Sequence, residues 1–174
     1  MAVSIEQLTA GQPIGTEEQD WGQHRLRLNA YAGALEVPEA LVTSVRGVVV
    51  RHAQVLLMKA PDGYHIMPGG RREAGEDYVG TVRREVREES GWMVDVGERL
   101  GVLHFHHLTP RPAGHSYPYP DFLQLVYACA ALRKIGDGDG EWDVPVGFTS
   151  IDELAQRDIG PVQMWFARSL LEER

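Results

Sequence analysis

The chain has 174 residues, of which 43% are hydrophobic and 24% charged, enough to bury the core of one ordinary domain. Its formal net charge of -8 disfavours nonspecific binding to nucleic acid or to an anionic membrane surface. The N-terminal residues show neither a basic leader nor an apolar run, and no apolar segment is long enough to span a membrane. We therefore expect a cytoplasmic protein.

The first 40 residues contain only one short alternating run, Leu26 to Tyr31, which predicts a strand. We expect this lead-in either to pack over one edge of the domain or to take part in a homodimer. Two β-rich runs follow, at 42–50 and at 54–59. The break between them at His52-Ala53 predicts a hairpin.

A tight loop and a helix come next in the chain. Pro68-Gly69-Gly70 has the composition of a turn. Val79, Val82 and Val86 then fall at i, i+3 and i+7, which predicts a helix that packs on a core through an apolar stripe. Gly91 stands where a glycine commonly ends a helix.

The polar side of this helix carries three glutamates with unusual spacing. Glu85, Glu88 and Glu89 stand at i, i+3 and i+4, which brings their carboxylates together on one side. Like charges so placed repel one another, by a few tenths of a kcal/mol for each pair, and a bound cation would relieve that repulsion. The alternative is a solvated helix with ordinary salt bridges, since Arg84 precedes Glu88 by four residues. The flanking loop and apolar stripe favour the metal-binding interpretation.

Residues 109–120 form the most distinctive segment after the helix. This stretch has four prolines in twelve residues, which excludes an internal strand or helix. We expect a surface loop that serves as a lid or specificity element, or only as a stiff connector. The other elements expected here are strands at 93–96, 100–107 and 122–132, a flexible loop at 136–140, and helices at 151–156 and 162–173.

Two other residue types were weighed as functional groups. His104 and His106 should project from one face of a strand, but a zinc site there lacks an identifiable third ligand, so hydrogen bonding or packing is favoured. Cys129 lies in an apolar run, which favours a buried inert thiol over a nucleophile.

The loop, the acidic helix and its closing glycine together resemble the signature of the Nudix hydrolases. That family's pattern is Gly, five residues, Glu, seven residues, then Arg-Glu-apolar-any-Glu-Glu-any-Gly-apolar. Val86 and Trp92 occupy the apolar places. The fixed positions are met by Gly70, Glu76, Arg84, Glu85, Glu88, Glu89 and Gly91. A match at seven fixed positions is far more specific than a lone glycine pattern.

The resemblance implies a fold class and a domain layout. The fold is the Nudix-type α/β/α sandwich around a mixed β-sheet, which agrees with the order of the predicted elements. We place the Nudix domain at 41–174 and the lead-in at 1–40.

The resemblance also implies roles for individual residues. Glu85 and Glu89 would be the leading Mg²⁺ ligands, with Glu88 as a further ligand or acting through a water. The backbone carbonyl of Gly69 would be an extra ligand, and Arg84 would orient a glutamate. Mg²⁺ prefers hard oxygen donors of this kind, and Mn²⁺ can replace it in such sites.

The general base is open between two candidates, Glu85 within the helix and Glu141 after the second glycine loop. For Glu141, an exposed surface glutamate is the favoured interpretation.

The expected activity is Mg²⁺-dependent hydrolysis of a pyrophosphate bond in a nucleoside diphosphate derivative, a phosphorylated small molecule. The alternative is a catalytically silent Nudix-fold module that binds a nucleotide and regulates. Nucleoside triphosphates, nucleotide sugars, ADP-ribose and dinucleoside polyphosphates all remain as candidate substrates.

Overall fold

The computed structural model describes residues 2–140 and 143–172. Eight strands and four α-helices make up this part of the chain. In order they are α1 (Ile5–Ala10), β1 (Gly15–Trp21), β2 (His24–Ala32), a 3₁₀ turn η1 (Glu39–Leu41), β3 (Val42–Arg51), β4 (Gln54–Ala60), β5 (Gly63–His65), α2 (Tyr78–Ser90), β6 (Trp92–His107), β7 (Asp121–Lys134), β8 (Val144–Thr149), α3 (Ile151–Leu154) and α4 (Pro161–Leu171).

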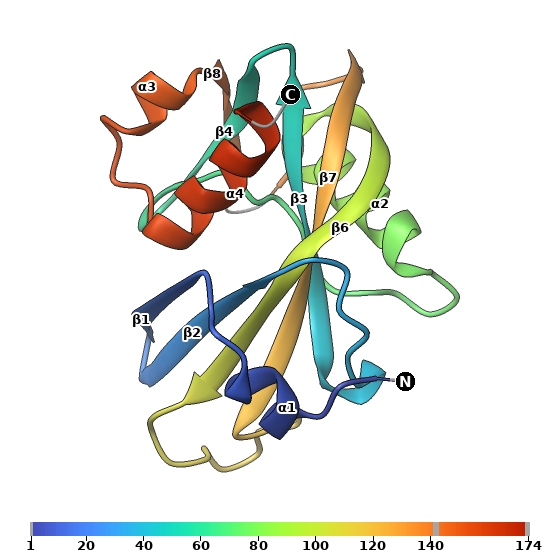
Figure 1. The fold of residues 1–174 in the computed structure, drawn as a ribbon. Helices are drawn as coiled ribbons and strands as arrows, with labels where there is room; N and C mark the ends of the chain where they lie inside the picture. The colour runs from blue at the N-terminus through green and yellow to red at the C-terminus, as the bar shows by residue number, and fades with distance from the viewer. Residues whose placement is uncertain (1, 141–142, 173–174) are drawn as a thin grey trace.

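One mixed sheet organises the molecule. Its strand order is β1-β2-β6-β7-β3-β4-β5, and β8 pairs with β4 off this path. β3 and β7 run parallel, whereas the other neighbours are antiparallel. The long strands β3, β6 and β7 cross the centre and connect the upper and lower halves of the molecule (Figure 1). The predicted mixed sheet is confirmed.

Both faces of this sheet are covered, because the central strands are apolar on both sides. Along β7, Leu125 and Cys129 belong to the core beneath α2, whereas Val126 belongs to the core beneath α4. Val86 is the α2 residue at the centre of the first core, and Phe166 is the α4 residue in the second. Helices therefore lie on both faces, as the predicted α/β/α sandwich requires (Figure 1).

Helix α2 approaches the sheet closely because β3 carries a glycine at the contact. A Cβ placed on Gly47 would lie 3.1 Å from Val86 and 3.2 Å from Val82. The ends of the helix are also well defined. The Asp77 side chain accepts from an amide in the first turn, and Gly91 ends the helix with φ 72°. The glycine terminus predicted from sequence is confirmed.

The lead-in contributes two strands to the sheet. β2 pairs with β6 over seven registered positions, which include the predicted strand at 26–31, and β1 forms the edge. The Glu17 carboxylate on β1 accepts from the Val162 amide at the start of α4, at 2.7 Å. The sequence did not predict α1 or β1, because β1 is an edge strand rich in polar residues. A role in a homodimer stays a prediction.

Several predicted boundaries need correction. The strands expected at 93–96 and 100–107 form one strand, β6, whose register shifts around Arg99 instead of breaking. The 42–50 and 54–59 hairpin exists, but β3 and β4 pair at only two positions, and the main partner of β3 is β7. The expected helices are shorter, as α3 and α4, and the short strands β5 and β8 were not predicted.

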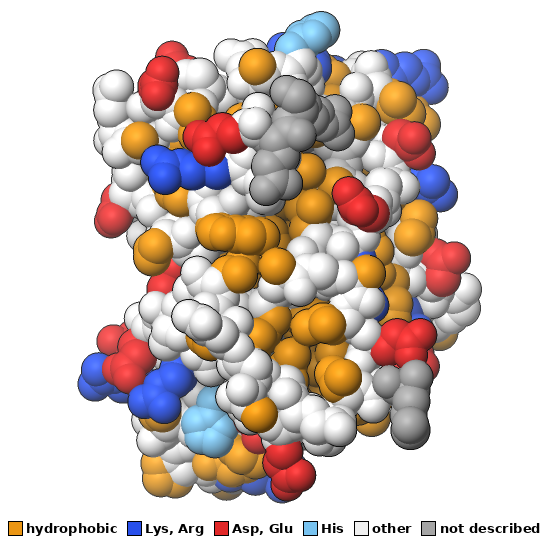
Figure 2. Space-filling model, viewed as in Figure 1, with side chains coloured by type: hydrophobic (Ala, Val, Ile, Leu, Met, Phe, Trp, Pro, Cys, Tyr) orange, Lys and Arg blue, Asp and Glu red, His pale blue; other side chains and the backbone are white. Residues whose placement is uncertain are grey.

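On the face seen in Figure 2, hydrophobic side chains gather in the middle, between α4 above and the β1–β2 hairpin below. Charged side chains lie mostly around the rim of this face. Among the described residues, no helix is both long enough and apolar enough to cross a membrane.

Candidate active site

The loop before α2 is held tightly against β3. The amide of Val45 donates to the Gly70 carbonyl at 2.9 Å, and the amide of Gly47 donates to the Pro68 carbonyl at 2.8 Å. Gly69 has φ 153°, and a Cβ there would lie 2.1 Å from the Val45 carbonyl oxygen. Only glycine fits at this position. The loop therefore has one defined path beside the acidic face of α2.

Arg84 joins the acidic groups of the loop and helix. Its guanidinium binds both oxygens of Glu76, at 2.7 and 3.0 Å. It also donates to Glu85 at 2.9 Å, to Glu88 at 3.1 Å and to the Arg71 carbonyl at 2.9 Å. The planar fork of arginine makes this set of bonds, which the point charge of lysine could not. These contacts fit the orienting role expected of Arg84.

The charges in this network stabilise each other. The hydrogen bond from Arg84, followed by that from the Glu73 amide, lowers the pKa of Glu76 from 4.5 to about 2. The same bond to Glu76, with those to Glu85 and Glu88, raises the pKa of Arg84. Glu76 is therefore a permanent anion that fixes the guanidinium, which in turn fixes Glu85 and Glu88.

Glu85 and Glu89 lie on the side of α2 that faces the glycine loop. A Cβ on Gly70 would lie 2.4 Å from a Glu85 carboxylate oxygen, so Glu85 packs directly on the loop backbone. The Gly69 amide donates to Glu89 at 3.0 Å. Burial raises the pKa of Glu89 to about 7, although the Gly69 amide and the Arg46 charge oppose this. A cation beside Glu89 would favour its ionised form.

The donor chemistry of this group fits a divalent metal. Glu85, Glu88, Glu89 and the Gly69 carbonyl offer only oxygen, as Mg²⁺ prefers. Among the described residues, however, no three acidic, histidine or cysteine side chains converge on one point. Arg84 holds Glu85 and Glu88, and the loop amide holds Glu89. Closing around an ion therefore requires rotation of these side chains, while the helix already supplies the correct spacing.

Sequence reasoning missed Arg46, a partly buried cation beside the acidic group. It donates to the Gly69 carbonyl at 2.9 Å and to the Gln124 side chain at 3.1 Å. Its charge acts on Glu89, on Asp143 and on Glu85, while burial lowers its own pKa. The signal was present in the sequence as a single arginine inside the apolar run of β3.

The remaining predicted residues fall in different places. Glu141 lies outside the described residues. The loop that precedes it packs against the end of α2, where the Asp139 amide donates to the Glu88 carbonyl at 2.7 Å. His104 and His106 do share a strand face, and both bond the same oxygen of Asp121, at 2.7 and 2.8 Å. They therefore have a hydrogen-bonding partner, as favoured above.

Two cavities lie beside the acidic group and share Trp21, Arg46 and Gln124 in their walls. The smaller one, about 300 Å³, reaches Gly70 and Arg71 of the loop. The larger one, about 720 Å³, lies between β1 and the start of α4. Arg46 therefore faces both cavities, and Gly70, which lies against Glu85, lines the smaller one.

Comparison with known proteins identifies the family. Residues 41–165, well over half of the chain, match the model of the NUDIX domain. The chain belongs to the NUDIX family. The resemblance based on Gly70 to Trp92 is thereby confirmed.

Relatives of this NUDIX chain are known from sequence and from structure. A putative ADP-ribose pyrophosphatase, YjhB from Bacillus subtilis, is 35% identical over 98 residues. That match covers 56% of this chain but only 43% of the relative, so the chain spans less than half of that protein's length.

Two solved structures confirm the fold of this NUDIX chain. A NUDIX hydrolase from Nitrosomonas europaea superposes with a TM-score of 0.55 at 22% identity, covering 71% of this chain and 84% of that one. A NUDIX family hydrolase from Clostridium perfringens gives a TM-score of 0.54 at 19% identity, covering 74% and 95%. At these identities the likeness establishes the fold.

Proposed function

We propose that this NUDIX chain hydrolyses a pyrophosphate bond in a nucleoside diphosphate derivative, with Mg²⁺ or Mn²⁺ as its cofactor. The observation that carries the proposal is the pair of contacts that hold the three glutamates beside the glycine loop: Arg84 bonds Glu85 and Glu88, and the Gly69 amide bonds Glu89. Gly70 of that loop lines a cavity. A helix with surface salt bridges alone would not need a partly buried arginine bonded to four separate groups.

The metal, when bound, would neutralise charge on the phosphates and make a coordinated water more acidic. Glu85 and Glu89 would hold it, with Glu88 and the Gly69 carbonyl as further ligands. Because Arg46 already donates to that carbonyl, the carbonyl must serve both partners through its two lone pairs.

Residues of the chain would also accept the proton that the attacking water loses and stabilise the negative charge of the departing phosphate. A water oxygen attacks one phosphorus, and the bond from that phosphorus to the bridging oxygen breaks. Glu85 or Glu141 accepts the proton that the water loses. Arg46 lies in the walls of both cavities, where its charge can stabilise the departing phosphate.

The candidate substrates all contain a phosphoanhydride bond, which excludes simple phosphate esters. We would test ADP-ribose first, because the chain is similar to a protein named as a putative ADP-ribose pyrophosphatase. Nucleotide sugars, nucleoside triphosphates and dinucleoside polyphosphates follow it.

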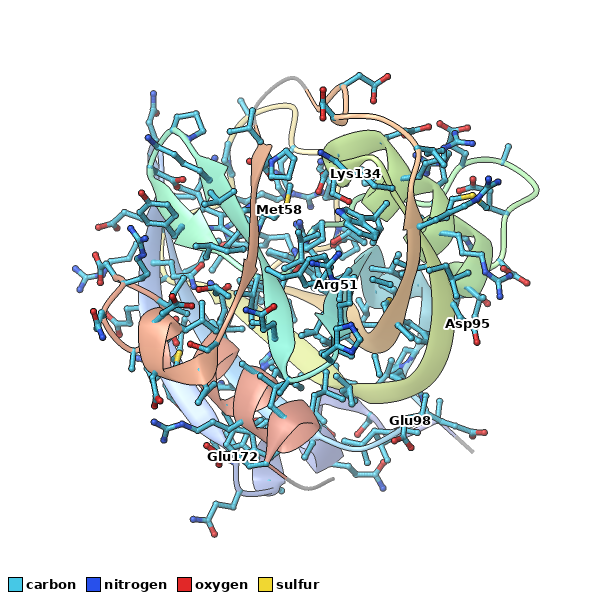
Figure 3. All side chains as sticks on the ribbon, turned by 90° about the horizontal axis from the view of Figure 1, so that it is seen from above. Arg51, Met58, Asp95, Glu98, Lys134 and Glu172 are labelled. Carbon is cyan, nitrogen blue, oxygen red and sulfur yellow. The ribbon has the colours of Figure 1, made fainter. Side chains whose placement is uncertain are left out.

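The test is to incubate the purified chain with Mg²⁺ and each member of this panel, and to follow the release of phosphate esters. Glu89→Gln keeps an acceptor for the Gly69 amide but removes the charge, and should abolish turnover. Glu98→Gln is the matched control, because Glu98 is exposed and points outward at the rim of the molecule (Figure 3). Metal-independent nucleotide binding without turnover would instead favour the silent regulatory module.

A further inference from the structure

The smaller cavity has a composition that the metal-binding residues do not explain. Its apolar lining includes Trp21 and Phe122, and its polar lining includes three histidines, His24, His107 and His115. We call it the histidine-lined cavity. Its volume of about 300 Å³ lies at the lower end of the range for small-molecule pockets, which suits one ring system.

Four buried polar atoms in this cavity have no hydrogen-bond partner among the described residues. They are Nδ1 of His24, Oγ of Ser44, Nδ1 of His107 and Nε2 of His115. Of the three histidines that line this cavity, His107 is the most enclosed, at 7% exposed. Buried polar groups are rarely left unpaired, because each loses its bonds to water without replacement. Four of them around one apolar cavity indicate a ligand with several donors and acceptors.

The aromatic rings around the cavity provide a surface for stacking. Trp21 packs on Phe105 at 5.1 Å and on Phe122 at 6.1 Å between ring centroids. It is still 43% exposed, so it can accept a further ring. The rings of His24 and His115 lie 5.6 and 5.4 Å from that of His107. Burial, with its two neighbours, lowers the pKa of His107, which leaves one donor and one acceptor nitrogen on its ring.

The mouth of the cavity adjoins the acidic site. Gly70 and Arg71 line it, and Gly70 lies against the Glu85 carboxylate. The Arg71 guanidinium lies 4.1 Å from the Tyr117 ring centre and hydrogen-bonds its hydroxyl. A ring bound in the cavity would therefore have both the Arg71 cation and Gly70 of the glycine loop beside it at the cavity mouth.

We propose that the histidine-lined cavity binds the heterocyclic base of the nucleoside part of the substrate. The base stacks beside Trp21, its edge bonds the histidine nitrogens and Ser44, and its phosphates extend past Arg71 toward Glu85. His115 and Tyr117 belong to the proline-rich segment 109–120, which is therefore a specificity element and not a connector. This inference rests on the proposed function, since it identifies the part of the substrate that the cavity binds.

The experiment measures binding separately from turnover. Calorimetry in EDTA compares AMP, GMP, CMP and UMP with ribose 5-phosphate, which has the phosphate but no base. We expect at least one nucleotide to bind about tenfold or more tightly than ribose 5-phosphate. Trp21→Ala should reduce that affinity roughly fivefold or more, the lower end for loss of one stacking ring.

Two histidine variants test the polar lining. His24→Leu replaces the unpartnered ring nitrogen with carbon and should also weaken nucleotide binding while leaving ribose 5-phosphate unchanged. His52→Asn is the control for a histidine substitution away from the cavity, because His52 lies exposed in the β3–β4 turn with φ 56°, which asparagine tolerates. Circular dichroism checks that each variant folds. Trp21 and His24 pair across the β1–β2 hairpin, so the comparison of nucleotides with ribose 5-phosphate on the wild type is the test that does not depend on either variant folding.

The possible results separate this inference from the proposed function. Equal binding of nucleotides and ribose 5-phosphate would overturn the inference, as would a base preference that both variants retain. Tight Zn²⁺ binding that His24→Leu abolishes would also overturn it, in favour of a metal site. If base binding is found and no substrate is hydrolysed, only the proposed function fails.

Discussion

Glu89 should make the stability of the chain fall as pH rises from about 4.5 to about 7. Burial raises the pKa of this carboxyl to about 7 in the folded chain, against a reference value of 4.5. Between these two pH values the folded state holds a proton that the unfolded state has released. Stability therefore decreases with rising pH in this window, and the loss is complete above about pH 7.

The magnitude follows from the difference between the two pKa values. One pKa unit corresponds to about 1.36 kcal/mol of free energy. The rise in the pKa of Glu89 from 4.5 to about 7 therefore changes the free energy of unfolding by at most about 3 kcal/mol. That is a large share of the roughly 5–15 kcal/mol that stabilises a typical domain. Bound Mg²⁺ should cancel most of the loss, because a cation favours the carboxylate.

The assay is urea unfolding of the wild type and Glu89→Gln at intervals from pH 4 to 8. The variant keeps the acceptor for the Gly69 amide but cannot titrate, so the histidines and other groups affect both proteins equally. We expect the wild type to lose about 3 kcal/mol relative to the variant across this range. Parallel curves would refute the reasoning that burial of Glu89 outweighs the charge of Arg46 and the hydrogen bond from the Gly69 amide.

Three further predictions concern the groups that shape the site. Arg46→Met removes a partly buried cation together with its two hydrogen bonds and should destabilise the chain by about 3–6 kcal/mol in urea unfolding; the exposed Arg133→Met should change stability by less than about 0.5 kcal/mol. Gly69→Ala forces a Cβ against the Val45 carbonyl and should cost about 1–3 kcal/mol by the same assay; the control is Gly63→Ala, which has nearly the same φ but no atom within 4 Å, and an equal loss in that control would count against the close contact as the cause. Arg84→Lys should lower kcat at least about tenfold while the circular dichroism spectrum stays native, because lysine cannot hold Glu76, Glu85 and Glu88 at once; an unchanged kcat would contradict the orienting role.

The metal-binding residues could be predicted from sequence because they are local. Glu85, Glu88 and Glu89 share one helix, and a 3.6-residue repeat determines which side chains meet. The glycine loop also precedes that helix directly, so its contact with Glu85 follows from a short stretch of chain. Spacing within a single element was sufficient here.

The cavities and Arg46 could not be predicted in this way. Arg46 reaches Gln124 because β3 and β7 are parallel neighbours, although 78 residues separate the two. The histidine-lined cavity likewise joins Trp21 of β1 to His115 of the 109–120 segment. Contacts of this kind depend on strand order, which the local pattern of a strand does not specify. Strand β6 shows the same limit. The sequence predicted two separate strands there, because the residues around the register shift at Arg99 resemble a break between strands.

The most direct test of the account is binding of Mn²⁺, followed by electron paramagnetic resonance, to the wild type, Glu85→Gln, Glu89→Gln and the control Glu98→Gln. Mn²⁺ accepts the same oxygen ligands as Mg²⁺ and gives a signal when free. The account predicts that each of the first two variants weakens binding at least about tenfold, the effect of roughly 1.4 kcal/mol, whereas Glu98→Gln matches the wild type. Equal binding by all four proteins would contradict the claim that this helix holds the metal.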